Sequence, residues 1–157
     1  MKEEIFLRRI SAQGKLKIAE PSDEICDSYL RKSENNLISA KILFSNNQLE
    51  DTISLSYYSM YNKLVGLFFK VGIKSENHSA SIILMKKIFE LDNLVIMSAK
   101  KERVDKQYYI DFEITKQEVG ETIVIAEDFN KDLDDFISKL TNDKIEAYRK
   151  KFKEVVR

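Results

Sequence analysis

The sequence predicts an all-α bundle that forms one domain. The 157-residue chain contains only four Gly and one Pro, too few for the turns of a β-sandwich or another loop-rich fold. Several long segments place apolar residues at three- and four-residue steps, which is the period of a helix face. At this length folding buries roughly 68–70% of the surface of the unfolded chain, enough for a substantial core.

Composition also limits the possible functions. The 26 basic and 26 acidic residues cancel, so no overall field favours nucleic acid or a membrane, although local patches can still bind them. The single cysteine, Cys26, excludes an internal disulfide and a cysteine zinc site. Residues 1–9 lead into no apolar segment, so we expect no secretory signal and a cytoplasmic protein.

The first elements expected are a short helix and an extended arm, both within residues 1–20. Pro21 or Ser22 should then open a long helix that reaches Asn46, with an acidic first turn that suits the helix dipole. Its apolar face is interrupted over residues 32–36. The apolar positions of that face are Ile25, Tyr29, Leu37, Ala40, Leu43 and Phe44.

The second long helix is expected over residues 49–71, with Gly72 placed to end it. Apolar or aromatic side chains occur nearly all round this helix, so we expect it to be buried on more than one side. Between Thr52 and Phe69 the only charge is Lys63, but five Ser, Thr and Asn residues would be costly in a bilayer. We therefore expect no membrane association. The predicted core positions are Ile53, Tyr57, Met60, Leu64, Leu67, Phe68 and Val71.

Shorter elements are expected in the next part of the chain. Residues 73–77 are polar and predict a short loop. A third helix should cover residues 78–90, and a fourth should cover residues 92–106 and end in basic residues. Residues 107–114 are aromatic and irregular. The predicted buried positions of the third helix are Ile82, Met85, Ile88 and Phe89.

The last core helix starts with a capping-box pattern. In this pattern the Thr115 oxygen and the Glu118 side chain satisfy each other's free backbone N–H groups. The helix should reach Leu140, and a basic helix should begin at Thr141 or Asn142. The predicted buried positions of the last core helix are Val119, Ile123, Ala126, Phe129, Leu133, Phe136 and Ile137. The chain thus divides into an N-terminal arm, a helical bundle and a C-terminal basic helix packed on the bundle, over residues 1–20, 21–140 and 141–157.

Several common catalytic motifs are missing. The sequence has neither GxGxxG nor GxxxxGK[ST], the glycine-rich patterns that cradle phosphates. A di-iron bundle needs two Glu-x-x-His motifs, whereas His78 is the only histidine. No strand–turn–helix elbow surrounds a serine, so a Ser-His-Asp hydrolase is not expected. We expect no metal ion and no cofactor.

His78 is the only side chain whose ordinary pKa lies near neutrality. It stands at the start of a helix, beside Lys74, Glu76 and Asn77. It is either a partly exposed helix residue with a structural hydrogen bond, or a general acid or base in a cleft. Its position alone favours the structural role.

Aromatic and basic residues also have two interpretations each. Tyr57 and Tyr61 are one helical turn apart and should stack along one face, with Tyr58 beside them. Aromatic residues at this spacing belong more often to a core or an oligomer interface than to a nucleic-acid platform. The basic run near Arg103 can contact phosphates, or it is a solvated helix end. This run comprises Lys100, Lys101, Arg103 and Lys106.

Two segments and the arm resemble the HEPN domain, especially its small single-domain prokaryotic and archaeal branch. The first segment is SYLRKSENNLISAKILFSNNQLEDTISLSYYSMYNKLVGLFFKVGIKSENHSASIILMKKIF. It has a helix ending in A-x-x-L, an acidic residue after a turn, a Y-Y-x-M-Y-like centre and a glycine-bounded loop leading to histidine. The second, ERVDKQYYIDFEITKQEVGETIVIAEDFNKDLDDFI, is similar to the branch's R-x-x-x-D-Y segment and last core helix. With the GKLKIAEPS arm, the resemblance covers about residues 14–140.

The resemblance implies an up-and-down bundle of four to five main helices with short flanking helices, paired as a homodimer. Many HEPN proteins are metal-independent endoribonucleases, whose active site is assembled from both protomers around an Arg, four to six residues, then His. The Arg stabilises transition-state charge while the His moves the proton of the attacking 2′-hydroxyl. Small HEPN proteins are often encoded beside a minimal nucleotidyltransferase as a toxin and antitoxin.

This chain departs from the family motif. Val71, Gly72 and Ile73 stand where the motif needs its arginine. Lys74 is the nearest cation, and a lysine supplies a point charge without the bidentate fork of arginine. Ala80 replaces the tyrosine that is modified in related toxins.

Three functions follow from these observations. The first is a dimeric module of a toxin–antitoxin-like system, with a degenerate ribonuclease motif, that binds RNA, a nucleotide or a nucleotidyltransferase partner. Its candidate binding residues are Asn77, Tyr58, Tyr61 and Arg103. The second is an active endoribonuclease that uses His78 with Lys74 at the dimer cleft, and the third is a purely structural helical interaction protein. The nearly all-round apolar surface of residues 49–71 also favours a dimer, which a charge at Tyr58 or Phe69 should break.

Overall fold

Seven helices and a two-stranded sheet make up the computed structural model, which describes residues 1–108 and 113–157. The helices are α1 (Lys2–Ala12), α2 (Asp23–Ser45), α3 (Leu49–Val71), α4 (His78–Phe89), α5 (Leu94–Tyr108), α6 (Lys116–Ser138) and α7 (Asn142–Val156). The strands are β1 (Leu16–Ile18) and β2 (Ile73–Ser75), which pair antiparallel. The predicted all-α class is confirmed.

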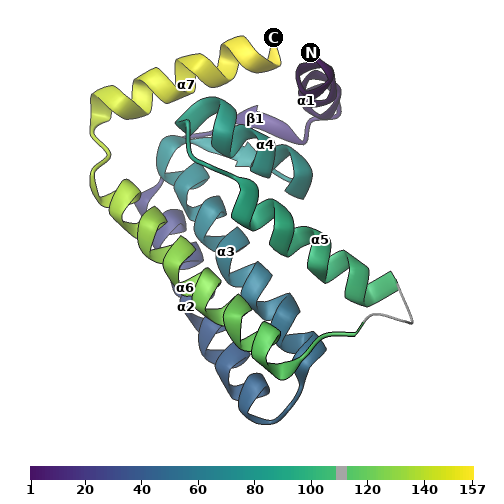
Figure 1. The fold of residues 1–157 in the computed structure, drawn as a ribbon. Coiled ribbons are helices and arrows are strands. Elements are labelled where there is room, and N and C mark those ends of the chain that lie inside the picture. Colours follow the sequence, from purple (N-terminus) through teal and green to yellow (C-terminus); the bar gives the residue numbers. More distant parts are fainter. Residues whose placement is uncertain (109–112) are drawn as a thin grey trace.

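Helix α3 runs through the middle of the molecule (Figure 1). Helix α2 lies along one side of it, α5 and α6 cover another, and β2, α4 and α7 contact it as well. All of its predicted core positions are buried. Elements of the same chain therefore cover most of its apolar surface, so the apolar surface of α3 does not by itself require a second copy of the chain. Phe69, for example, stacks on Tyr29 of α2 with ring centroids 5.4 Å apart.

Hydroxyl groups replace apolar packing where the apolar face of α2 is interrupted. The Ser33 hydroxyl donates to the Ser59 carbonyl at 2.6 Å, and the Ser59 hydroxyl donates to the Ser33 carbonyl at 2.8 Å. Asn130 of α6 donates its Nδ2 hydrogen to Ser59 Oγ at 2.8 Å.

One predicted core position of α2 was wrong. Ile25 is 41% exposed while the neighbouring Cys26 is buried, because this end of the buried face is rotated by one residue.

The N-terminal arm and the segment before His78 form the sheet. Leu16 pairs with Ser75, and Ile18 pairs with Ile73. The prediction of a polar loop over residues 73–77 was wrong, since Ile73 is fully buried in a strand. Each strand has only three residues, too few for an alternating pattern to be recognised.

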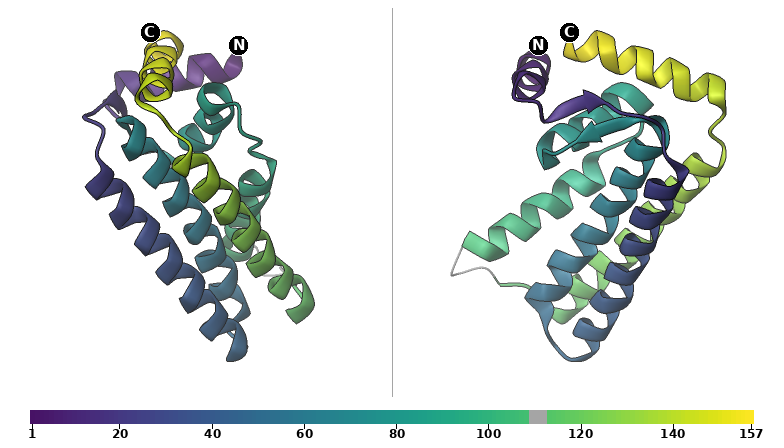
Figure 2. Two further views of the ribbon diagram at one scale, coloured as in Figure 1. Left: turned by 90° about the vertical axis from the view of Figure 1, so that its left-hand side faces the viewer. Right: turned by 180° about the vertical axis from the view of Figure 1, so that it is seen from behind.

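Helix α7 packs at the same end of the bundle as α1 and the sheet (Figure 2). Its Phe152 is buried, and the Nη1 group of Arg149 donates to backbone carbonyls of the α3 terminus and the arm. These carbonyls belong to Ala19, Gly72 and Val71, at distances of 2.7, 2.8 and 3.2 Å. Gly72 ends α3 in the left-handed conformation, with φ of 85°, as the sequence predicts. Arg149 thus joins three distant segments at the residues that lead to His78.

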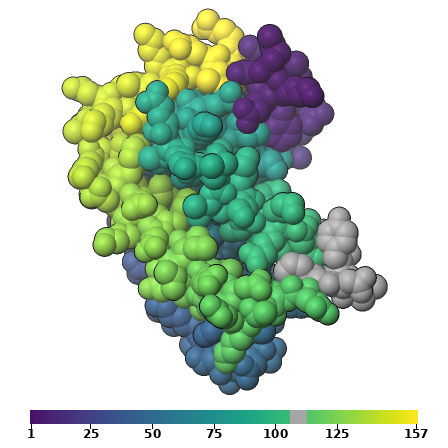
Figure 3. Space-filling view, in the orientation of Figure 1, coloured from purple at the N-terminus to yellow at the C-terminus, as the bar shows by residue number. Residues whose placement is uncertain are grey.

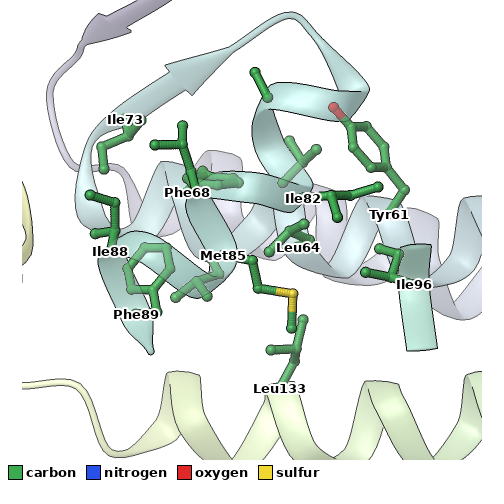
Figure 4. Packing of buried hydrophobic residues seen from close by; sticks show 14 of the residues in the cluster. Tyr61, Leu64, Phe68, Ile73, Ile82, Met85, Ile88, Phe89, Ile96 and Leu133 are labelled. Atoms are coloured by element: carbon green, nitrogen blue, oxygen red, sulfur yellow. The ribbon is translucent and has the colours of Figure 1, made fainter. Parts of the chain in front are cut away.

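The buried side chains of α4 fill the space between α3, β2 and α6 (Figure 4). Met85 points toward Leu133 of α6, and Ile88 lies beside Ile73. All four predicted positions of α4 are buried. The predicted positions of α6 are buried too, except for Phe136, which is partly buried. Periodicity therefore identified both buried faces.

The start of α6 is capped by one of the two bonds that a capping box requires. Thr115 Oγ1 accepts from the backbone N–H of Glu118 at 3.1 Å. The Glu118 carboxylate accepts from the Thr115 hydroxyl at 3.1 Å rather than from a backbone N–H, so the second half of the predicted capping box was wrong.

The predicted irregular segment over residues 107–114 begins inside α5, and its residues 109–112 lie outside the described part of the chain. None of the described helices is long and apolar enough to cross a membrane.

Candidate functional site

His78 is held at the first position of α4 by its local backbone. Strand β2 ends at Ser75, and Asn77 then adopts an extended conformation and caps the helix. Its Oδ1 accepts the backbone N–H of Ala80 at 2.8 Å. Asn77, which was a candidate binding residue, therefore uses its side-chain oxygen to position the start of the helix. This cap helps to fix where the imidazole projects.

Two tyrosines of α3 hold the imidazole. Its Nδ1 atom is hydrogen-bonded to the Tyr57 hydroxyl at 2.8 Å. Its ring stacks on Tyr61 with centroids 3.8 Å apart and planes 14° apart, and Tyr58 presents an edge at 6.4 Å. Nε2 makes no hydrogen bond to any residue that the structure describes. One nitrogen is thus used for positioning, and the other is free to meet a ligand.

The surroundings of His78 favour the uncharged imidazole. Burial lowers its pKa below the ordinary value, and the positive charges of Arg103 and Lys100 lower it further. Burial raises the pKa of Tyr57, so this phenol keeps its proton at neutral pH. The bond between them therefore joins two neutral groups, and His78 can act as a proton acceptor.

Arg103 enters this cluster from α5. Its Nη1 group donates to the Tyr58 hydroxyl at 3.2 Å. The guanidinium carbon lies 5.3 Å from the ring centroids of both Tyr57 and Tyr58, within the range of cation–π attraction. The buried Nε atom has no hydrogen-bond partner among the described residues. Four predicted site residues, His78, Tyr58, Tyr61 and Arg103, are therefore brought together.

A pocket of about 410 Å³ opens beside the imidazole, which we call the His78 pocket. Its residues are Tyr29, Lys32, Asn36, Tyr58, Tyr61, Asn62 and His78. Asn62 Nδ2 donates to Asn36 Oδ1 at 2.7 Å, so one amide hydrogen-bonds to the other. Lys32 lies with its Nζ atom 5.6 Å from the Tyr29 ring centroid. The pocket therefore combines aromatic rings, amides and a cation.

Comparison with protein families identifies the scaffold. The family model of the HEPN domain matches residues 26–136. The chain belongs to the HEPN family. The match runs from α2 into α6 and so contains every residue of the His78 pocket. A search of curated proteins returned no match.

This HEPN domain does not bring Lys74 to His78. Side chains alternate along a strand, and Ser75 points toward α4, where its hydroxyl bonds to Ser81 Oγ at 2.6 Å. Lys74 therefore lies on the other face, where it forms an ion pair with Glu76 at 3.3 Å. The cation next to the tyrosines around His78 is Arg103, which follows His78 in the sequence instead of preceding it.

The half of the His78 pocket that α2 supplies was not predicted from the sequence. Lys32 and Asn36 mark the two ends of the stretch where the apolar face of α2 is interrupted. That interruption was the only available signal, and it does not distinguish a solvated position from a pocket wall. Asn62 was noted only as a polar residue in an apolar helix.

Proposed function

We propose that this HEPN protein binds RNA, or a nucleotide of the same chemistry, at the His78 pocket. The observation that supports this proposal is the convergence of His78, the tyrosines, the paired amides and Lys32 in one pocket, with Arg103 of α5 bonded to the Tyr58 hydroxyl. Base stacking on aromatic side chains contributes about 1–3 kcal/mol per base in single-strand binding. The neutral overall charge makes such local groups, rather than a general field, the source of affinity.

Each part of the pocket suits one part of a nucleotide. Tyr58 and His78 offer aromatic surface to a base. Asn36 and Asn62 keep one amide hydrogen-bonding group each for a base edge, since their mutual bond uses only one group from each. Lys32 in the lining supplies charge for phosphate, and Arg103, which is outside the lining, adds a second charge beside Tyr58. A pocket with these three chemistries favours a nucleotide over an apolar ligand.

The binding proposal is tested with a fluorescein-labelled 12-nucleotide single-stranded RNA and with ATP, by anisotropy and competition in EDTA. Lys32→Gln should weaken RNA binding at least threefold and reduce the salt slope by about one phosphate contact. Asn36→Ala should weaken binding to a similar degree without changing that slope. Lys139→Gln, on the exposed end of α6, is the matched control. Equal affinity of all four proteins, or no binding at 50 mM salt, would contradict the proposal.

A second candidate function is metal-independent RNA cleavage, and the neutral His78 beside Arg103 favours it. In the tautomer whose Nδ1–H donates to the Tyr57 oxygen, Nε2 would take the proton of a 2′-hydroxyl, whose oxygen then attacks the phosphorus. The 5′-oxygen leaves with a proton from a water molecule, the imidazolium returns its own proton to solvent, and the product ends in a 2′,3′-cyclic phosphate. Arg103 would stabilise the charge that develops on the phosphoryl oxygens. Lys74 has no part in this version of the mechanism.

Cleavage of labelled total RNA in EDTA separates the two candidates. His78→Asn keeps a polar group near Tyr57 but removes the imidazole base, so it should abolish cleavage, while RNA binding is weakened by the lost aromatic surface and stays measurable. Arg103→Gln should slow cleavage at least tenfold, whereas Lys74→Gln should leave the rate unchanged. A wild-type protein that binds RNA but does not cleave it would contradict the cleavage function and support the binding function.

We further propose that the protein forms a homodimer and is associated with a nucleotidyltransferase partner in a toxin–antitoxin-like system, as its family membership suggests. Light scattering should give twice the 18.4 kDa mass of one chain for the wild type and the single mass for Tyr58→Asp. Both Tyr58 and Phe69 also pack within the chain, Phe69 on Tyr29 and Tyr58 against Arg103. Circular dichroism would confirm that the variant is folded.

A further inference from the structure

The hydrogen bond between Tyr57 and His78 can be formed in two ways. Either the phenol donates to an unprotonated Nδ1 atom, or a protonated Nδ1 donates to the phenol oxygen, across the same distance of 2.8 Å. A neutral imidazole has one N–H group, so the first arrangement leaves its hydrogen on Nε2 and the second leaves Nε2 as an acceptor. The direction of this bond therefore decides whether Nε2 donates to a ligand or takes a proton from it.

The burial of Tyr57 decides the direction of the bond. Its side chain is 0% exposed, and its hydroxyl has no hydrogen-bond partner except His78 Nδ1 among the described residues. If Nδ1 carried the hydrogen, the hydroxyl hydrogen of Tyr57 would be buried without an acceptor, which is destabilising. Burial also raises the pKa of Tyr57, so the phenol keeps this hydrogen at neutral pH. The phenol is therefore the donor, and Nε2 carries the hydrogen of the imidazole.

The Nε2 atom lies in positive surroundings. It makes no hydrogen bond to any described residue and is not buried. The charges of Arg103 and Lys100 act on the imidazole from α5, which lies next to α4 on the face of the molecule that Figure 3 shows. Lys32 adds a charge in the lining of the His78 pocket. An N–H donor near three cations suits an anionic oxygen better than a neutral acceptor.

We infer that Tyr57 is a positioning residue that holds His78 in the Nε2–H tautomer, so that the imidazole donates a hydrogen bond to the phosphate of a bound nucleotide. The inference rests on the binding function proposed above and names the group of the nucleotide that His78 contacts. Removal of a proton from a 2′-hydroxyl requires the opposite tautomer and therefore leaves the Tyr57 hydroxyl hydrogen without an acceptor. The direction of the bond thus favours binding over cleavage.

The tautomer is measured on the untagged, ¹⁵N-labelled protein without ligand, by long-range ¹H–¹⁵N correlation at pH 7.5. Because His78 is the only histidine, its ring nitrogens give the only imidazole signals. In the wild type, Nε2 should have the shift of a protonated nitrogen and Nδ1 that of an unprotonated one. Tyr57→Phe removes the donor, so both tautomers should be populated and the two shifts should approach each other. Tyr148→Phe, which removes a partly buried phenol hydroxyl from α7, is the matched control.

The phosphate contact is tested with uridine and uridine 5′-monophosphate, which differ only in the phosphate. The monophosphate should bind to the wild type about fivefold more tightly than uridine and should move the Nε2–H signal further. In Tyr57→Phe this preference should fall about twofold or more, whereas Tyr148→Phe should keep it.

A protonated Nδ1 in the free wild type would overturn the inference, whatever the protein binds. Wild-type nitrogen shifts and a wild-type preference for the monophosphate in Tyr57→Phe would overturn it too. Equal binding of uridine and its monophosphate would remove the phosphate contact but leave the His78 pocket as a binding site. Binding of neither compound would contradict the binding function as well, so the two failures are distinguishable.

Discussion

The regions on the two sides of Tyr57 differ in how their polar groups are hydrogen-bonded. On the His78 side, the sheet, α4 and α7 are joined by hydrogen bonds between residues far apart in the sequence, and Arg149 alone bonds to carbonyls of three residues. On the opposite side, which we call the Ser56 side, α5 and α6 meet over α3 mainly through apolar side chains, and the buried Ser56 hydroxyl has no hydrogen-bond partner among the described residues; on the His78 side the same holds for Arg103 Nε. A fixed imidazole needs the first kind of structure, whereas the packing of helices on one another needs only the second.

The largest expected loss is at Gly72, whose substitution would break the His78 side. A Cβ atom there would lie 2.6 Å from the Ala19 carbonyl oxygen and would overlap the Arg149 guanidinium. With the positive φ, Gly72→Ala should lower the free energy of unfolding by about 3 kcal/mol or more. Gly14→Ala is the matched control, because its φ is also positive but nothing lies within 4 Å. It should cost only about 1–2 kcal/mol in urea unfolding.

Arg149→Met should produce the next largest effect. The substitution keeps most of the apolar side-chain contacts but leaves carbonyls of the α3 terminus and the arm with fewer donors. We expect a loss of about 2 kcal/mol in the free energy of unfolding. Hydrogen exchange should increase at β1 and β2 before it increases at α6. Lys150→Met, exposed on the same helix, should stay within about 0.5 kcal/mol of the wild type, and an equal loss in both variants would contradict this account.

A smaller effect is expected on the pKa of His78. Arg103→Gln removes a positive charge that disfavours the imidazolium, so the pKa should rise toward its ordinary value in an NMR titration. Lys101→Gln is the control, because this exposed lysine pairs with Asp105 and is not among the charges that lower the pKa of His78. An unchanged pKa in Arg103→Gln would show that burial and Lys100 account for the shift without Arg103.

The same pKa gives stability a pH dependence. Because the folded state has the lower pKa, the unfolded chain binds more protons in the window between the two values. Stability is therefore unaffected by His78 above its ordinary pKa of about 6.5 and decreases as the pH falls below it. His78→Gln should remove this part of the slope in urea unfolding between pH 7.5 and pH 5, and parallel slopes would contradict the prediction.

The smallest effect is expected on the outer surface of the Ser56 side. Val124 of α6 is 57% exposed, so Val124→Lys should change the free energy of unfolding by less than about 0.5 kcal/mol. The mass measured by light scattering should not change. A large loss of stability or of mass would show that this surface is covered in solution, and the contrast between the two sides of Tyr57 would then need revision.

Periodicity in the sequence was enough to place the helices and most of the core. The bounds of α3 and the role of Gly72 were predicted because a long apolar helix followed by glycine is a local pattern. The sheet was missed because its strands are short and lie far apart in the sequence. For the site, His78, Tyr58, Tyr61 and Arg103 could be nominated by residue type, but Lys32 and Asn36 could not, because only folding brings α2 beside His78.

The sequence by itself determined the helical class, the buried faces and the HEPN resemblance that the family match confirms, because these depend on residue order within one or two helices. The tertiary structure decided which cation accompanies His78. Strand pairing turns Lys74 away from α4, and the packing of α5 on α3 brings Arg103 to the tyrosines. Neither relation is local in sequence, since each depends on how separate elements are oriented once they pack.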